Sequence, residues 1–414
     1  MDNITHSLLG LAVGEATVQL QKGKKSDLPY HTRLLFWLAS FFGNNAPDVD
    51  IVFNLFSPDR IFPYLSHRGH THTVVVGSIL AFGGTAFLAA GYRWRGWQVS
   101  LKHWGIALGL AFLGVLLHLF ADSWNSYGVH PFWPFDNHWY YGDFIFIIEP
   151  FLWFSMIPAV WMATQNRFQK NMLIFLGVVL VGLIGLGPFV PSPIRWILLA
   201  WAGLMAASTR LSARKRIAVC FVAIAATLGS FWSVGRFTRQ QISLDLKTQK
   251  PSSQLLDLVL SPSPGNFFCW TFTALESESD VYRLEAGIFA PFSSFLPVEK
   301  CPQILTPEQR PSPLVASKNP NSASYLWKAE FQGSIREFQT LAHTHCWVRN
   351  FLQFVRTPIW EVNSEQVGLA DQRYYRGNQS ARFGSMLFES KKNTNCPGYL
   401  FPWIPPRLDL LSLR

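Results

Sequence analysis

The chain has 414 residues, of which 49% are hydrophobic and only 14% are charged. Soluble globular proteins carry about 25% charged residues, so this composition excludes an ordinary soluble enzyme and indicates a membrane protein. The formal net charge is +10. The lysines and arginines lie in short clusters between apolar runs and form no basic-aromatic stripe, so no nucleic-acid partner is expected.

Apolar segments near bilayer-spanning length follow one another through the first 235 residues. They are His6–Leu20, Arg33–Phe42, His72–Tyr92, His103–Ala121, Phe144–Ala163, Asn171–Val190, Ile194–Ser208 and Ile217–Gly235. The first, second and seventh are short, so we predict five to eight membrane crossings. No cleavable signal peptide is expected, because no basic stretch precedes the first apolar run. Residues 1–235 are therefore predicted to form a polytopic transmembrane helical bundle.

The basic residues in the loops predict the orientation of this bundle. One set of alternate loops holds Lys22, Lys24, Lys25, Arg33, Arg93, Arg95, Lys102, Arg167, Lys170, Arg210, Arg214, Lys215 and Arg216. The other set holds only Arg60, Arg68 and Arg195. Because positively charged loops stay in the cytoplasm, we expect the N-terminus and the second set outside. An even number of crossings would also place the C-terminal part outside.

The composition changes at about Arg236, where charged residues, serine and proline become frequent. Stretches of strand length that mix aromatic, β-branched and polar residues predict a β-rich soluble domain over residues 236–414. These stretches are Phe267–Leu275, Val281–Phe289 and Ser324–Phe331.

The cysteines agree with an outside location for this domain. Cys220 lies in an apolar run, whereas the polar part holds Cys269, Cys301, Cys346 and Cys396. An even number of cysteines suits disulfides in an oxidising compartment. No C-x-x-C pair is present, so a cysteine zinc site is not expected.

Ionisable residues in or beside membrane segments are costly, which favours a functional interpretation. Here they gather at the predicted outer ends of the segments. The groups are His6 beside Thr5; Asp48 and Asp50 in the NNAPDVD sequence; His67, Arg68, His70 and His72; His118 and Asp122; and Asp136, His138, Asp143 and Glu149. Distant parts of the chain would thus converge at one membrane level, which predicts a metal site.

The spacing of these residues supports that hypothesis. His118 and Asp122 are four residues apart and share one face of a helix. Gly69 permits a tight turn between His67 and His72. Imidazole and carboxylate ligands without a thiolate suit zinc, and also manganese or iron.

Each group also has a structural alternative when taken alone. A single buried histidine is more often structural than a ligand. Asp48 and Asp122 could cap helices, His118 could bond a neighbouring helix, and Arg68 could anchor a lipid headgroup. His70, His103, His130 and His138 are interpreted as surface or interface residues. Only the joint convergence favours a metal.

At these residues the sequence resembles the YdjM-like, LexA-binding family of bacterial inner-membrane proteins, which are predicted metal-dependent hydrolases. The resembling motifs are MDNITHSLLG, APDVD, HRGHTH, HLFADSWNSYG and FIFIIEP, in matching order over roughly the first 165 residues. The LexA-type partner is implied by the family name alone. The resemblance implies the inner membrane, and the loop charges predict that the site lies on its periplasmic side.

This family is distantly similar to zinc-dependent phospholipase C and S1/P1-type nucleases. The resemblance implies these metal ligands: His6, Asp48, His67, His72, His118 and Asp122. It implies supporting roles for Asp50 and Arg68. Glu149 stands where many relatives carry aspartate, so no role follows for it. The H-x-x-x-E pair of the phospholipases is missing from the apolar core, so a three-zinc site is not implied.

The resulting hypothesis is a metal-dependent hydrolase that acts on a phosphoester or lipid-linked substrate at the outer membrane face. Asp48 or Asp50 would serve as general base or orient the water. Arg68 would stabilise developing negative charge. The alternatives are a metal or ion transporter or sensor, and a non-enzymatic scaffold. Transport is disfavoured because the later segments are nearly free of charge and no internal repeat is seen.

Overall fold

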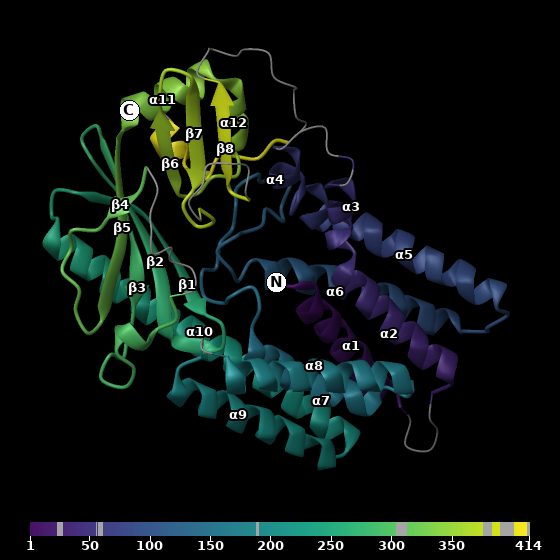
Figure 1. Cartoon of the computed structure of the whole chain (residues 1–414). Coiled ribbons are helices and arrows are strands. Elements are labelled where there is room, and N and C mark those ends of the chain that lie inside the picture. Colours follow the sequence, from purple (N-terminus) through teal and green to yellow (C-terminus); the bar gives the residue numbers. More distant parts are fainter. Residues whose placement is uncertain are drawn as a thin grey trace. The chain divides into compact units, whose positions relative to one another are not determined.

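The computed structural model describes residues 1–22, 28–54, 56, 61–187, 190–303, 313–375, 383–389 and 401–411. Lys24, Lys25, Arg60 and Cys396, which entered the predictions above, lie outside this set. The chain forms two compact units (Figure 1). The N-terminal unit comprises Met1–Leu55, His67–Asp136 and Tyr140–Phe231, and the C-terminal unit comprises Phe56–Ser66, Asn137–Trp139 and Trp232–Arg414.

Each of the eight predicted apolar segments is helical over most of its described length, except that Phe144–Glu149 precede α7 and are not helical. The long helices are α1 (Asn3–Gln21), α2 (Tyr30–Asn45), α5 (Val74–Trp94), α6 (Leu101–Asp122), α7 (Pro150–Ala163), α8 (Arg167–Leu186), α9 (Ser192–Ala207) and α10 (Ala213–Gln249). Short helical turns join them: η1 (Pro47–Asp50), α3 (Ile51–Asn54), η2 (His70–His72) and η3 (Ser208–Arg210). The predicted helical N-terminal half is confirmed.

Within the described residues, four helices are long and apolar enough to cross a membrane: α5, α6, α8 and α10. Helix α7 is apolar but shorter. This number is lower than the predicted five to eight crossings. Helices α2 and α9 have only 16 residues each. Helix α1 carries the buried Glu15, which accepts hydrogen bonds from Gln19 and from the Trp37 indole of α2.

Side-chain caps set the starts of several helices. The Asp2 carboxylate accepts the backbone N–H groups of Ile4 and Thr5 at the start of α1. The Thr73 hydroxyl accepts the N–H of Val76 at the start of α5. Such caps satisfy N–H groups that have no partner within a helix. Thr73 therefore begins α5 directly after His72, which fixes where that histidine lies relative to the helix.

Glycines allow helices α2 and α6 to pack closely. A Cβ atom added at Gly114 of α6 would lie 2.7 Å from the backbone N of Asn44 and 2.8 Å from the carbonyl carbon of Gly43, both in α2. Small residues at such crossings let helix backbones approach each other in membrane proteins. Because α2 ends beside Asp48 and α6 carries His118 and Asp122, this contact brings two segments with predicted ligands together.

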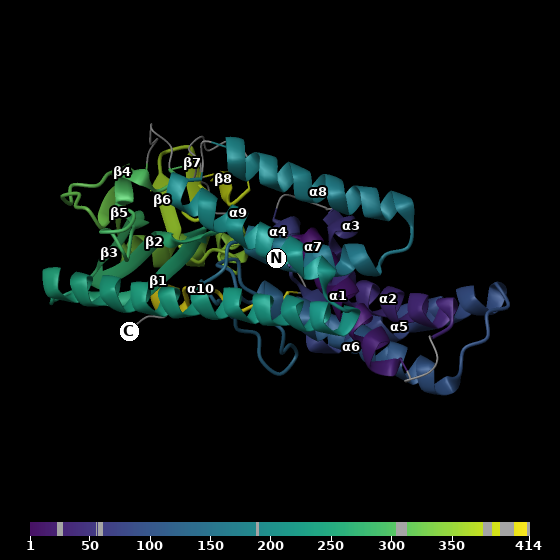
Figure 2. The ribbon, with the colours of Figure 1, turned by 90° about the horizontal axis from the view of Figure 1, so that it is seen from below.

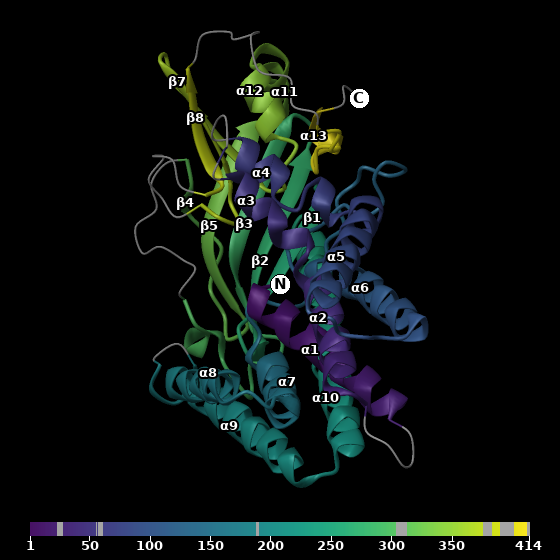
Figure 3. The same ribbon diagram turned by 90° about the vertical axis from the view of Figure 1, so that its right-hand side faces the viewer.

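The C-terminal unit is built on two antiparallel sheets (Figure 3). The larger sheet has the order β1-β2-β3-β5-β4, from β1 (Gln254–Ser263), β2 (Asn266–Glu278), β3 (Val281–Phe289), β5 (Tyr325–Ser334) and β4 (Val315–Ala316). The smaller sheet pairs β6 (Pro358–Val362), β7 (Gln366–Asp371) and β8 (Ser385–Glu389). The unit also contains α4 (Phe62–Ser66), η4 (Val298–Lys300), α11 (Ile335–Thr344), α12 (Cys346–Phe351) and α13 (Leu408–Leu411). The predicted β-rich region is confirmed.

The unit boundaries differ from the predicted division at residue 235. Helix α10 is one unbroken helix (Figure 2), and the boundary falls inside it, between Phe231 and Trp232. The segment Phe56–Ser66 belongs to the C-terminal unit, where the Leu65 carbonyl accepts the Trp403 indole N–H at 3.0 Å. The sequence alone could not predict that this segment packs within the C-terminal unit.

Disulfides stabilise the C-terminal unit. Cys269 of β2 is bonded to Cys301. Cys346 is also disulfide-bonded, whereas Cys220 in α10 is a buried free thiol. These findings agree with the prediction that the cysteines of the polar part form disulfides.

Gly114→Ala is expected to destabilise the helical unit, because its methyl group would meet the α2 backbone rather than a side chain that can move. Overpacking of this kind costs about 1–3 kcal/mol. Gly109→Ala in the same helix is the matched control, since nothing lies within 4 Å of its added Cβ. Thermal unfolding in detergent should give a lower Tm for Gly114→Ala only. Equal Tm values for the two variants would contradict the packing described here.

Candidate metal centre

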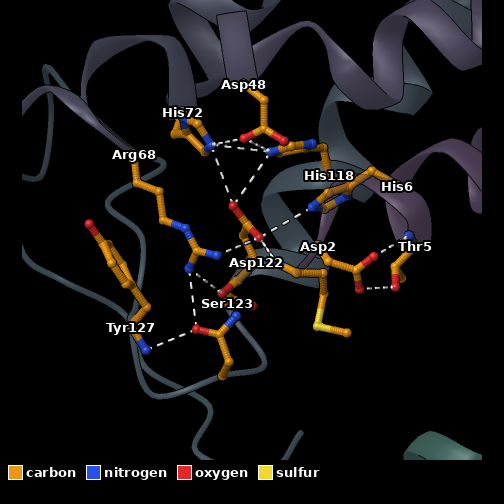
Figure 4. A network of polar contacts seen from close by, with 12 residues as sticks. Asp2, Thr5, His6, Asp48, Arg68, His72, His118, Asp122, Ser123 and Tyr127 are labelled. Atoms are coloured by element: carbon orange, nitrogen blue, oxygen red, sulfur yellow. Dashed lines mark hydrogen bonds and ion pairs between the residues drawn. The ribbon is translucent and has the colours of Figure 1, made fainter. Parts of the chain in front are cut away.

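Four ligand atoms from separate parts of the chain face one another at the end of the helical unit (Figure 4). They belong to Asp48 of η1, His72 of η2, and His118 and Asp122 of α6. The two histidine Nε2 atoms lie 3.2 Å apart. His72 Nε2 lies 3.3 Å from Asp48 Oδ1 and 3.4 Å from Asp122 Oδ2. His118 Nε2 lies 3.6 Å and 3.4 Å from the same two oxygens.

These separations fit a tetrahedral metal ion. Zinc binds imidazole nitrogen and carboxylate oxygen at 2.0–2.2 Å, which places neighbouring ligand atoms of a tetrahedron about 3.3–3.6 Å apart. The five distances between these four atoms run from 3.2 to 3.6 Å. The donor set of two imidazoles and two carboxylates is also one that divalent metals accept. The predicted residues therefore fit a metal, and we call these four residues the inner group.

Hydrogen bonds to the far side of each imidazole direct its Nε2 atom into the inner group. His118 Nδ1 lies 2.7 Å from the backbone carbonyl of Asn44, to which it can donate. His72 Nδ1 lies 3.2 Å from Asp50 Oδ2 and 3.2 Å from the Thr71 hydroxyl. Metal-binding histidines usually donate their second ring N–H to a carbonyl or carboxylate, which fixes the ring and raises its basicity.

A second ligand group shares one residue with the first. Asp48, Asp50 and His67 each offer a ligand atom, and these atoms lie within 4.8 Å of one another. The His67 side chain is 27% exposed, whereas those of His72 and His118 are fully buried. We call Asp48, Asp50 and His67 the outer group. Asp48 thus belongs to both groups, and the most exposed ligand, His67, belongs to the outer group alone.

Asp50 has many partners for a single carboxylate. Its Oδ1 lies 3.2 Å from His67 Nδ1. Its Oδ2 accepts the Arg68 backbone N–H at 2.9 Å and the Thr71 hydroxyl at 3.2 Å, and it also faces His72 Nδ1. The side chain is 1% exposed. Asp50 therefore holds the segment from His67 to His72 in place while it orients both histidines.

The two oxygens of Asp122 have different surroundings. Oδ2 faces His72 and His118. Oδ1 accepts a hydrogen bond from the Arg68 guanidinium at 2.9 Å and forms an ion pair with the amino group of Met1. Because Arg68 and the Met1 amino group contact Oδ1, Oδ2 is the oxygen that faces the two histidine Nε2 atoms.

Arg68 is buried and surrounded by acceptors. Its Nη1 donates to the backbone carbonyl of Gly128 at 3.1 Å, to Asn125 Oδ1 at 3.2 Å and to the backbone carbonyl of Asp122 at 3.3 Å. The guanidinium also lies over the Tyr127 ring at 4.6 Å. The Arg68 backbone has φ +55°, a conformation that residues other than glycine rarely adopt. The contacts of this side chain tie the end of α6 and the loop that follows it to the Asp122 carboxylate.

His6 lies beside the inner group rather than within it. Its Nε2 is 3.3 Å from Asp122 Oδ1, and its ring stacks on that of His118 with centroids 3.7 Å apart. The neighbouring Thr5 hydroxyl accepts the Trp153 indole N–H at 2.9 Å, which links α1 to α7. The structure therefore brings all six predicted ligands together, with His6 at the edge of the cluster.

The two aspartates of η1 remain charged despite their burial. Burial raises the pKa of Asp48, but the hydrogen bond from His72 and the charges of His118 and His72 outweigh it and lower the pKa to about 2. Burial likewise raises the pKa of Asp50, and hydrogen bonds from His67 and His72 lower it well below its usual value. Carboxylates must be deprotonated to bind a metal, so both aspartates are in the form that binds a metal near neutral pH.

The last predicted group of ionisable residues does not join the cluster. Asp136, His138, Asp143 and Glu149 belong to neither ligand group among the residues that the structure describes. Glu149 is fully buried and caps α7, where its Oε1 accepts the Phe151 N–H at 3.1 Å. The interpretation of His130 as a surface or interface residue is wrong, because its side chain is fully buried within the unit.

Several supporting residues were not predicted. The backbone carbonyl of Asn44 orients His118, and no sequence pattern reveals the role of a carbonyl. Thr71 lies within the HRGHTH motif, but no role was predicted for it. Its hydroxyl donates a hydrogen bond to Asp50 Oδ2 and lies 3.2 Å from His72 Nδ1. The Asn125 side chain and the Gly128 carbonyl accept hydrogen bonds from Arg68. Both residues lie in the HLFADSWNSYG motif, so the motif could have pointed to them.

Comparisons with known proteins find similarity in the N-terminal part of the chain. Residues 1–190 match the model of the family described as YdjM inner membrane protein. Over 190 residues the chain is 29% identical to YfhP of Bacillus subtilis (strain 168), an alignment that covers 44% of this chain and 54% of YfhP. The chain thus spans about half the length of this curated relative. No solved structure matches. The matched region contains both ligand groups.

His118→Ala is expected to abolish metal binding at the inner group, because it removes one of four converging ligand atoms. His103→Ala is the matched control, since this half-buried histidine lies at the other end of the same helix and bonds Ser100 instead. Elemental analysis of the purified variants should show metal loss for His118→Ala and retention for His103→Ala. Unchanged metal content in both would contradict the assignment.

Asp50→Asn tests whether this carboxylate orients His72. The amide keeps the shape of the side chain but removes its charge, and loss of such a partner typically weakens metal affinity about 10- to 100-fold. Because Asp50 also belongs to the outer group, the comparison is made in a His67→Ala background, where competition with a chromogenic chelator should detect weaker binding at the inner group. An affinity equal to that of the parent protein would show that His72 needs no carboxylate behind it.

Proposed function

We propose that the protein is a membrane-bound metal-dependent hydrolase that cleaves a phosphoester or lipid-linked substrate at the outer face of the inner membrane. The observation that carries the proposal is the pair of ligand groups that share Asp48. Two-metal sites that share ligands are common in enzymes that cleave phosphate esters.

The two groups differ in how many ligands the protein supplies. The inner group offers four protein ligands, which is typical of closed zinc sites. The outer group offers three, which is typical of catalytic sites that leave a position for water or substrate. The exposed edge of His67 lies in this outer group. We therefore assign the inner group to holding the site together and the outer group to the reaction.

A divalent metal, for which zinc fits best and manganese or iron are alternatives, would lower the pKa of a water and polarise a phosphoryl oxygen when bound. Asp50 holds His67 and His72 in the required orientation, and both of its oxygens are engaged. Of the two aspartates considered as general base, Asp48 is therefore the better candidate, since it lies between the groups and retains slight exposure. Its low pKa keeps it deprotonated near neutral pH.

Arg68 receives a different role from the one that the sequence suggested. Its guanidinium already contacts Asp122, Asn125 and Gly128 and is buried. We assign it as a positioning residue that holds Asp122 rather than one that stabilises charge on the substrate. This assignment explains why a buried arginine lies beside a cluster that would bind cations, because Asp122 supplies the compensating negative charge.

The substrate class is inferred from the position of the site. His72 lies just before α5 and Asp122 ends α6, and both helices are able to cross a membrane. The ligands thus lie at one end of two spans, near the depth of lipid headgroups. Together with the loop charges, which favour the outside for this end, this location supports membrane lipids or lipid-linked phosphoesters as substrates.

The test combines metal content with turnover. Detergent-purified protein reloaded with zinc or manganese should hydrolyse bis-p-nitrophenyl phosphate or phosphatidylglycerol, and His67→Ala should reduce turnover to background. The same variant should keep about one of two metal equivalents, because the inner group lacks His67. His103→Ala should retain both metal and activity.

Two results would contradict the proposal. Full metal loading without hydrolysis of any phosphoester would favour a metal sensor, a transporter or a scaffold. Loss of all metal from His67→Ala would show that the two groups are not separate sites.

A further inference from the structure

Five phenylalanines from three segments of the C-terminal unit form one cluster, which we call the Phe platform. They are Phe237 of α10, Phe267 and Phe268 of β2, and Phe292 and Phe295 of the loop after β3. Phe237 stacks on Phe292 with centroids 5.7 Å apart, and Phe268 lies 5.9 Å from Phe292 and 4.8 Å from Phe295. Phe267 contacts Phe268 at 4.5 Å.

The Phe platform is partly open to its surroundings. Phe237 is 41%, Phe292 40% and Phe295 49% exposed. Single exposed apolar residues are normal on a protein surface, but a contiguous aromatic group of this kind marks an interaction site. The position of the Phe platform in the fold indicates which kind of partner covers it.

The loop that carries Phe292 and Phe295 is held firmly. Cys301, just past its end, is disulfide-bonded to Cys269, the residue that follows Phe268. Leu296 and Val298 are fully buried beneath it, and the Val298 N–H donates to the Ala323 carbonyl at 3.0 Å. The loop therefore presents its two phenylalanines on a fixed base, so their exposure is a property of the fold.

Helix α10 sets the depth of the Phe platform relative to a membrane. The helix is able to cross a membrane, and its apolar run ends at Gly235, two residues before Phe237. Just before that point Trp232 is 54% exposed and lies beneath the Arg236 guanidinium at 5.9 Å. Tryptophan and arginine at the end of a span are typical of the membrane–water interface. Phe237 therefore lies at the level where α10 leaves the lipid.

The β1–β2 hairpin returns to the same level. The Arg239 guanidinium donates to the Leu258 carbonyl at 2.6 Å, which fixes the middle of β1 against α10 (Figure 2). From Gln254 to Ser263 the strand covers about 30 Å. The helix covers only about 18 Å from Gln249 back to Phe237. The strand is therefore long enough for the start of β2 to reach the level of Phe237, and the contacts of Phe292 with Phe237 and Phe268 show that it does.

We propose that the Phe platform inserts into the interfacial layer of the lipid bilayer and anchors the C-terminal unit to the membrane surface. Lipid is favoured over a protein partner because the platform is continuous with the interface end of α10. The disulfide beside it, between Cys269 and Cys301, agrees with the outer side, where oxidising conditions prevail. The proposal is independent of the hydrolase assignment, since no residue of either ligand group takes part.

Photocrosslinking in proteoliposomes of phosphatidylethanolamine and phosphatidylglycerol tests the proposal. p-Benzoylphenylalanine replaces Phe295 in the full chain, and a second variant carries it in place of Phe292. The matched control carries it in place of Val362, which is 42% exposed and lies at the end of β6 in the smaller sheet. After irradiation, mass spectrometry should find lipid adducts at position 295 or 292 and only background at position 362.

The remaining outcomes overturn the proposal. Equal lipid yields at all three positions would show that the Phe platform has no preference for the bilayer. Adducts to polypeptide at position 295 would identify a protein interface instead. Non-reducing electrophoresis of each variant should confirm that the Cys269–Cys301 disulfide is intact, so that a null result reports on the platform and not on misfolding.

Discussion

Three buried carboxylates at one end of an apolar helical unit are the constraint on which the rest of its structure depends. The side chains of Asp48, Asp50 and Asp122 are between 1% and 8% exposed. Buried charges are costly unless they are paired and hydrogen-bonded. Arg68 compensates Asp122 on one side. The histidines face the carboxylates on the other side, where a divalent metal would complete the compensation.

The helices around this cluster are arranged so that it can form. Close packing of α2 against α6 at Gly43 and Gly114 brings the Asn44 carbonyl to His118. The cap at Thr73 starts α5 directly after His72. The site therefore depends on backbone contacts some distance from the ligands as well as on the ligands themselves.

Much of this architecture could be predicted from the sequence. Each of the eight apolar segments coincides largely with a helix, and the three predicted strands overlap β2, β3 and β5. The i, i+4 spacing of His118 and Asp122 correctly placed them on one face. The family resemblance implied supporting roles for Asp50 and Arg68, but their specific contacts were not predictable, because they depend on how the loop from His67 to His72 folds back. The membership of Phe56–Ser66 in the C-terminal unit depends on tertiary packing in the same way.

The most direct test of the metal centre is X-ray absorption spectroscopy at the metal edge of the purified, reloaded protein. Our account predicts a first shell of nitrogen and oxygen atoms at about 2.0–2.1 Å, with outer-shell scattering from histidine rings and no sulfur. A shell without imidazole scattering, or failure to retain any divalent metal after reloading, would contradict it. In that case the cluster would be a polar network that holds the helices together, and the hydrolase proposal would lose its basis.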